Sequence, residues 1–119
     1  MELYTDVLVV GGGPSGVAAA ISASREGART LIAEKSGLFG GMSTGGLLNV
    51  WCGSASSDVW ETVRDRTTEK RQRRSVFSPE TLKSLYPELL EEAGAEMLLH
   101  AQLIDVEKDG DRVKTAVFY

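Results

Sequence analysis

Apolar residues follow two patterns that alternate along the chain. Largely apolar runs over 7–10, 29–33 and 96–101 predict short buried strands. Between them, apolar and small residues recur at intervals of three and four over 17–24 and 82–93, which predicts helices that bury one face. Strands that alternate with helices indicate an α/β fold with a parallel sheet, because a helix is the usual crossover between parallel strands.

Local signals predict where the other helices begin and where one is interrupted. A short helix is predicted over Val59–Thr67, with Asp58 as its N-cap. Ser78 and Pro79 predict the start of the longer helix, as N-cap and first helical residue. Pro87 falls inside that helix and has no N–H for the preceding turn, so we expect a kink or a break there.

The last part of the chain has a different pattern. Asp109-Gly110 separates the segments 104–108 and 112–119, and this dipeptide favours a tight hairpin turn. We therefore predict a hairpin that opens an antiparallel β-meander over 102–119. The whole pattern indicates one domain over 1–119, in which a Rossmann-like parallel βαβ sheet is followed by the start of a meander.

Three glycines follow the first strand at the spacing of a dinucleotide-binding turn. Gly11 allows the sharp turn out of the strand, and Gly13 lets the backbone approach a pyrophosphate. Gly16 lets the helix lie close to the strand. The start of that helix offers unpaired N–H groups and the positive end of its dipole to phosphates.

The second strand ends at an acidic residue. Glu34 lies 18 residues after Gly16, where a carboxylate can accept hydrogen bonds from both hydroxyls of an adenosine ribose. The same charge repels a 2′-phosphate, which disfavours a phosphorylated nicotinamide cofactor. The alternative is a glycine-rich turn in an α/β protein that binds no nucleotide.

Charge and cysteine content narrow the class of protein. The chain has 119 residues and a formal net charge of −4, and it contains no apolar run long enough to span a membrane. We expect no membrane or nucleic-acid partner. The single cysteine, Cys52, cannot form an internal disulfide and is compatible with the cytoplasm. Cys52 is either a redox thiol or, as free cysteines often are, a small buried hydrophobe.

Basic residues gather in one segment of this acidic chain. A nucleic-acid surface would come with a basic domain and interleaved aromatic residues, and neither is present. The segment is interpreted as a solvated loop, and the alternative is a surface that attracts an anionic substrate or partner. Its members are Arg64, Arg66, Lys70, Arg71, Arg73 and Arg74.

Several motifs together resemble one family. They are Gly11–Gly16, Glu34-Lys35, the loop Gly40-Gly41-Met42-Ser43-Thr44, the helix start Phe77-Ser78-Pro79-Glu80 and the segment Leu99-His100-Ala101. With these motifs the chain resembles the N-terminal part of FAD-dependent oxidoreductases of the two-dinucleotide-binding-domain superfamily, and within it the fumarate reductase and succinate dehydrogenase branch. The resemblance implies an incomplete FAD-binding domain.

The resemblance also implies roles for particular segments. The turn over 11–16 would hold the FAD pyrophosphate, Glu34 the adenosine ribose, and the loop over 40–43 would pass beside the pyrophosphate and ribityl chain. The backbone of 102–103 would meet the adenine edge. The implied FAD-binding residues are Gly11, Gly13, Pro14, Ser15, Gly16, Glu34, Lys35, Gly40, Gly41, Met42, Ser43 and Leu103.

Neither a flavin attached through histidine nor a metal site is expected. No histidine lies in 40–46, where some relatives attach the flavin, so the resemblance implies noncovalent FAD. The only histidine, His100, is placed in a strand and given a structural role. No metal site and no catalytic residue are identified.

The resemblance covers only the beginning of the family's pattern. Relatives carry a second motif that closes on the flavin and then a substrate domain, and neither is found in these 119 residues. We expect the FAD-binding portion of an oxidoreductase that is inactive alone, and either a homo-oligomer or a missing remainder of the chain. The alternatives are a non-catalytic dinucleotide-binding or structural fragment and an NAD-binding Rossmann module. The glycines of 40–46 favour FAD.

Overall fold

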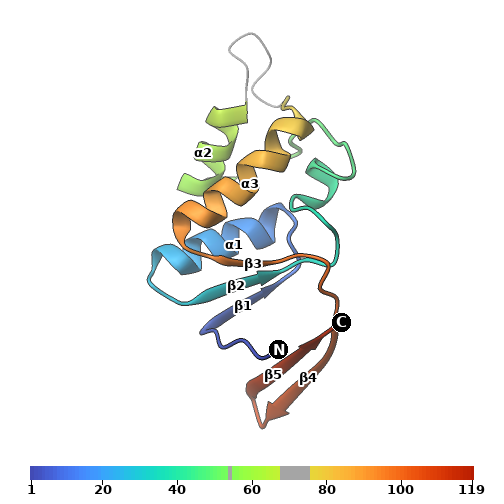
Figure 1. Ribbon diagram of the computed structural model, residues 1–119. Coiled ribbons are helices and arrows are strands. Elements are labelled where there is room, and N and C mark those ends of the chain that lie inside the picture. Colours follow the sequence, from blue (N-terminus) through green and yellow to red (C-terminus); the bar gives the residue numbers. More distant parts are fainter. Residues whose placement is uncertain (54, 68–75) are drawn as a thin grey trace.

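The computed structural model describes residues 1–53, 55–67 and 76–119. Its elements are β1 (Val7–Val10), α1 (Pro14–Arg25), β2 (Thr30–Ala33), the short 3-10 helix η1 (Gly41–Ser43), α2 (Asp58–Thr67), α3 (Pro79–Ala93), β3 (Glu96–Leu98), β4 (Leu103–Asp109) and β5 (Arg112–Phe118). The three α-helices lie on one side of a three-stranded sheet, and the β4–β5 hairpin lies beyond its other side (Figure 1).

The sheet is parallel, as predicted, and its strand order is β1-β2-β3. Val10 of β1 pairs with Ala33 of β2, and Ala33 pairs in turn with Leu98 of β3, so all three strands end at one edge. The third strand is shorter than predicted. It stops at Leu98 because the backbone of His100 takes a positive φ of 55°, which a strand cannot contain. The placement of His100 in a strand was therefore wrong.

The core lies between the sheet and two of the helices. α1 packs on β1 and β2, and α3 packs against α1. Of the small stripe predicted on α1, Val17, Ala20 and Ile21 are buried, and Ser24 at its end is half-buried. The three buried residues meet Ile32 of β2 and Leu90 of α3, which are fully buried as well. This layer of helices fixes the strands whose ends form the candidate site.

α3 begins as predicted and is not broken by its proline. The Ser78 side chain accepts a hydrogen bond from a backbone N–H in the first turn, and the helix continues through Pro87 to Ala93. The expectation of a break was wrong. The residues around the proline, Tyr86 and Leu89, are 2% exposed, so their packing offsets the lost backbone hydrogen bond.

α2 begins one residue earlier than predicted and has a different cap. Ser57 Oγ accepts a hydrogen bond from the N–H of Trp60, 3.1 Å away, so Ser57 is the N-cap. Asp58 was the predicted cap. Its carboxylate instead forms an exposed ion pair with Arg25 of α1, with a distance of 2.8 Å between Oδ2 and Nη1.

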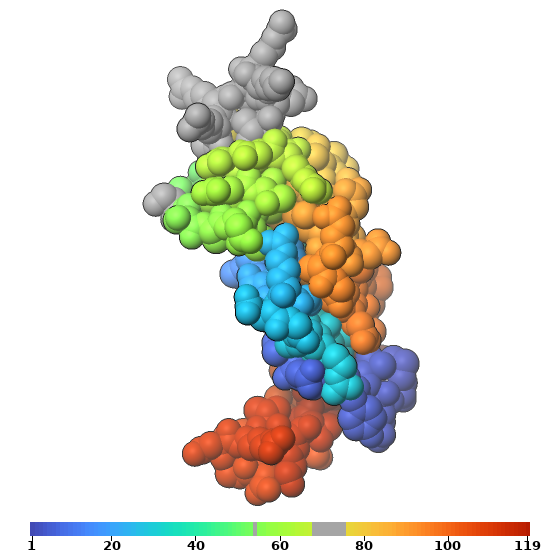
Figure 2. All heavy atoms as spheres, turned by 90° about the vertical axis from the view of Figure 1, so that its left-hand side faces the viewer, coloured from blue at the N-terminus to red at the C-terminus, as the bar shows by residue number. Residues whose placement is uncertain are grey.

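The C-terminal hairpin matches the predicted meander segment. Leu103 pairs with Phe118, and Asp109 pairs with Arg112 around Gly110. Gln102 and Tyr119 exchange two backbone hydrogen bonds of 2.9 Å, so the paired segment covers 102–119. The hairpin lies at one end of an elongated molecule, away from α2 and α3 (Figures 1 and 2).

Gly16 gives a test of how closely α1 lies against the first strand. A Cβ at this position would lie 1.9 Å from the carbonyl oxygen of Gly11. Alanine normally favours a helix over glycine. Here we expect Gly16→Ala to lower the free energy of unfolding by roughly 1–3 kcal/mol in urea denaturation. Ser22→Ala, on the exposed side of α1, is the control, and a stabilised Gly16→Ala protein would contradict the packing.

Candidate nucleotide-binding site

The turn between β1 and α1 presents unpaired N–H groups to open space. Gly11 has a φ of 101° and donates its N–H to the carbonyl of Ala33, 2.8 Å away. α1 then begins with Gly13 as N-cap and without a side-chain cap. The N–H groups of Ser15 and Gly16 therefore lack a helical partner, as in any first turn. A Cβ on Gly13 would meet nothing within 4 Å, so the turn is open to an anion.

The carboxylate of Glu34 is fixed by two backbone N–H groups. Gly12 donates to Oε2 and Ser36 donates to Oε1, each over 2.7 Å. Partial burial acts to raise the pKa of Glu34, but these hydrogen bonds and the charge of Lys35 outweigh it, so the pKa lies below its ordinary value. Glu34 is therefore a charged, oriented acceptor at neutral pH.

The glycine-rich loop after Glu34 is bonded directly to the turn. Gly40 donates its N–H to the carbonyl of Gly12 over 2.7 Å. A Cβ on Gly41 would lie 3.5 Å from the Cα of Gly13, so the loop runs beside the turn. Met42 is exposed. Ser43 is buried, and its hydroxyl donates to the carbonyl of Gly40 over 2.7 Å, so this side chain supports the loop from within.

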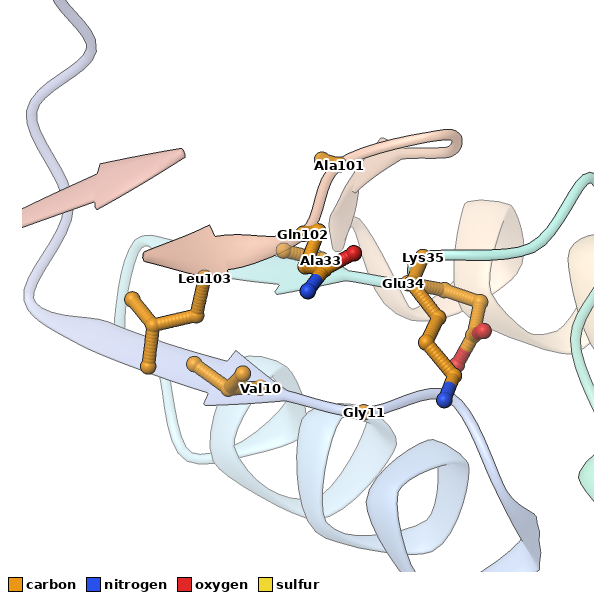
Figure 3. A pocket seen from close by; sticks show the side chains of 8 residues that line it. All are labelled: Val10, Gly11, Ala33, Glu34, Lys35, Ala101, Gln102 and Leu103. Carbon is orange, nitrogen blue, oxygen red and sulfur yellow. The ribbon is translucent and has the colours of Figure 1, made fainter. Parts of the chain in front are cut away.

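A hollow of about 150 Å³ joins these segments at the carboxyl edge of the sheet. In Figure 3 the side chains of Glu34 and Lys35 extend toward the glycine turn, and Leu103 lies toward Val10. The hollow is smaller than a typical ligand cavity of about 300–1,000 Å³, so it suits one part of a dinucleotide. Its lining residues are Val10, Gly11, Ala33, Glu34, Lys35, Ala101, Gln102 and Leu103.

The structure brings predicted site residues from separate stretches of sequence to the hollow, namely Gly11, Glu34, Lys35 and Leu103. The rest of the turn, residues 13–16, and the loop over 40–43 do not line the hollow. The turn continues directly from Gly11, and the loop is bonded to it through Gly40 and Gly12. These segments converge because the parallel strands end at one edge, the usual ligand position in open α/β sheets.

Other candidate residues lie away from the hollow. The His100 imidazole packs beside Gly37, where a Cβ would lie 2.9 Å from the ring carbon Cε1. Cys52 is exposed, so its interpretation as a small buried hydrophobe was wrong.

Of the basic segment, Arg64 and Arg66 form ion pairs with Asp65 and Glu92. The remaining members, Lys70, Arg71, Arg73 and Arg74, lie outside the described residues. The part of the chain that the structure describes contains no cluster of residues that could hold a metal ion.

Sequence reasoning missed Gly12, which contributes most to the assembly of this site. Both its N–H and its carbonyl are used, toward Glu34 and Gly40. A Cβ here would lie 2.4 Å from Cδ1 of the buried Phe39. The available signal was that Gly12 is the middle one of three consecutive glycines, a position where the dinucleotide-binding spacing requires no glycine.

The lowered pKa of Glu34 predicts a specific dependence of stability on pH. The charged carboxylate stabilises the folded chain above the ordinary glutamate pKa of 4.5, and this contribution is lost as pH falls through the lower folded pKa. The difference in unfolding free energy between wild type and Glu34→Gln is expected to shrink on acidification. Glu91→Gln, on the exposed face of α3, is the matched control. A difference that is constant between neutral pH and about pH 3 would contradict the assignment.

Two curated relatives share parts of this sequence. Sarcosine oxidase subunit alpha of Corynebacterium sp. (strain P-1) is 54% identical over 41 residues, which are 34% of this chain and 4% of that protein. NADH:fumarate oxidoreductase of Klebsiella pneumoniae (strain 342) is 41% identical over 78 residues, 66% of this chain and 8% of that protein. The chain thus spans a small fraction of either relative.

Solved structures share the fold. The crystal structure of Thermovibrio ammonificans THI4 superposes with a TM-score of 0.71 and 19% identity, covering 97% of this chain and 47% of that one. Lactococcus lactis thioredoxin reductase gives a TM-score of 0.62 and 24% identity, covering 97% and 31%.

The family assignment comes from the sequence profile described as "FAD dependent oxidoreductase". It matches residues 6–119, from the first strand to the end of the hairpin. This is nearly the whole chain and includes the turn, Glu34 and the loop over 40–43. The chain belongs to the FAD-dependent oxidoreductase family, whose cofactor is FAD.

Proposed function

We propose that this chain is the FAD-holding part of a flavin-dependent oxidoreductase, with its glycine turn at the pyrophosphate and Glu34 at the adenosine ribose. The observation that carries the proposal is the convergence of the uncapped start of α1 and the oriented Glu34 carboxylate on one hollow. A positive helix end suits a diphosphate, and a carboxylate suits the hydroxyls of a ribose.

The residues present fit the ADP half of FAD. Each oxygen of Glu34 accepts one backbone hydrogen bond and keeps acceptor capacity for a ribose hydroxyl. The open space before Gly13 admits a pyrophosphate oxygen to the N–H groups of Ser15 and Gly16. Leu103 and Val10 offer an apolar wall beside the hollow, where the flat adenine ring would lie.

When bound, FAD would supply the hydride-transfer chemistry of the enzyme. The described residues would bind and orient it noncovalently, because 40–46 contains no histidine. The loop from Gly40 to Ser43 would lie beside the pyrophosphate, with its backbone fixed by Gly12.

A cytoplasmic location is also proposed, from the single exposed Cys52. None of the described helices is long and apolar enough to cross a membrane.

A nicotinamide dinucleotide is the second candidate, because it shares the ADP half with FAD. The turn and Glu34 suit both. The feature that favours FAD is the loop bonded to the turn through Gly40 and Gly12, which extends the site beyond the first βαβ unit.

The proposal predicts that the purified chain binds FAD and that Glu34→Gln binds it about 10- to 100-fold more weakly, because hydrogen bonds to a charged group are lost. Titrations of FAD and NADH, followed by their fluorescence, measure both affinities. Glu91→Gln should bind like the wild type. Equal FAD affinity in Glu34→Gln would show that the ribose contact is misassigned, and tighter binding of NADH than of FAD would favour the nicotinamide alternative.

We also propose that apolar surface on the sheet and hairpin is covered by another polypeptide segment. β1 is an edge strand of the described sheet although Val7–Val10 is wholly apolar. On the hairpin, Ile104 and Val113 are 60% and 58% exposed. The occupant is either a second copy of this chain or further polypeptide.

For the isolated chain this predicts self-association. Sedimentation equilibrium should show a mass that rises with concentration, and Ile104→Lys combined with Val113→Lys should reduce it. A mass that stays monomeric at high concentration would contradict association between copies.

A further inference from the structure

A series of hydrogen bonds connects the core helix α3 to the glycine-rich loop. Tyr86 lies on the buried face of α3 and is 2% exposed. Its hydroxyl lies 3.4 Å from the hydroxyl of Ser43, a buried residue of η1. Ser43 also donates to the carbonyl of Gly40 over 2.7 Å, and its N–H bonds the same carbonyl over 3.0 Å. Two groups of Ser43 therefore hold one carbonyl of the loop.

The direction of the first hydrogen bond follows from proton count. Ser43 has one hydroxyl proton, and it is used toward Gly40. The Tyr86 hydroxyl must then donate to Ser43. Burial raises the pKa of Tyr86, which keeps the phenol protonated and able to donate. The Ser43 hydroxyl accepts from Tyr86 and donates to Gly40, so these two hydrogen bonds polarise each other.

The same connection continues from the loop to the carboxylate. Gly40 donates its N–H to the carbonyl of Gly12, and Gly12 donates its own N–H to Glu34 Oε2, each over 2.7 Å. Thr44 packs closely against Gly40, where a Cβ would lie 2.3 Å from Thr44 Cγ2. The carbonyl of Gly40 that Ser43 holds and the N–H that Gly40 donates belong to neighbouring peptide groups, so the backbone of Gly40 joins Ser43 to Gly12 and Glu34.

We propose that Tyr86 is a positioning residue for the nucleotide site, acting through Ser43, Gly40 and Gly12 on Glu34. The proposal rests on the function proposed above, since it assumes that Glu34 faces a nucleotide. Tyr86 touches no part of the hollow itself. Its hydroxyl fixes the loop from the core side, while its ring fills the core as a phenylalanine would.

The first test compares FAD affinity in single and double variants. Tyr86→Phe keeps the ring and removes only the hydroxyl, and we expect it to bind FAD about 3- to 10-fold more weakly, the range for one neutral hydrogen bond. In a Glu34→Gln background the same change should have a clearly smaller effect, because both act through one series. Tyr4→Phe, which loses an exposed hydrogen bond to Glu2, is the control and should bind normally. Equal effects of Tyr86→Phe in both backgrounds would overturn the proposal.

The second test needs no cofactor. The amide protons of Gly12 and Gly40 are the last donors of the series, so their NMR chemical shifts report its geometry. We expect both shifts to move toward those of weaker hydrogen bonds in Tyr86→Phe and in Ser43→Ala, and not in Tyr4→Phe. Ser43→Ala interrupts the series at its middle and replaces Tyr86→Phe if that variant does not fold.

The two tests separate the possible failures. Unchanged Gly12 and Gly40 shifts in a chain that binds FAD would overturn the role of Tyr86 and leave the proposed function intact. A wild-type chain that binds no FAD would overturn the proposed function, and with it a nucleotide-positioning role for Tyr86, even if the shifts move.

Discussion

The candidate site depends on the backbone of Gly12. Its N–H holds the Glu34 carboxylate and its carbonyl holds Gly40, so one residue joins the ends of β1 and β2 to the loop after β2. These bonds require the loop to approach so closely that any side chain at Gly12 would overlap with Phe39. The geometry of the turn, the carboxylate and the loop is therefore a single structural unit and not three independent features.

This unit places two opposite electrostatic environments side by side. The start of α1 is electropositive and uncapped. Glu34 is negative, and the backbone N–H groups of Ser36 and of Gly12 in the turn lower its pKa. Under the proposed function, the helix start would face negative charge on the ligand and Glu34 would face hydroxyl donors. The ADP half of a dinucleotide has this arrangement, so the proposal places its diphosphate at the helix start and its ribose at Glu34.

The sequence was sufficient for features with a local cause. The strand, turn and helix over 7–25 and the hairpin around Gly110 follow from apolar spacing and glycine chemistry, and the structure has them where they were predicted. What could not be predicted depends on tertiary contacts. The continuous helix at Pro87 and the short third strand before His100 are set by packing and by one backbone angle. Likewise, the hydrogen bond from Gly40 to Gly12 joins residues 28 positions apart.

The contact of the Tyr86 hydroxyl is another tertiary feature that the sequence alone could not predict. In the sequence it occupies one position of an apolar helical stripe, where it is equivalent to its leucine neighbours. In the structure its hydroxyl is buried, and a buried hydroxyl costs free energy unless it is paired. Phenylalanine would fill the same core volume without that cost. The partner that offsets the cost of burying the Tyr86 hydroxyl is the hydroxyl of Ser43. Ser43 belongs to the loop that is bonded to the glycine turn, so this pairing connects the core helix to the candidate site.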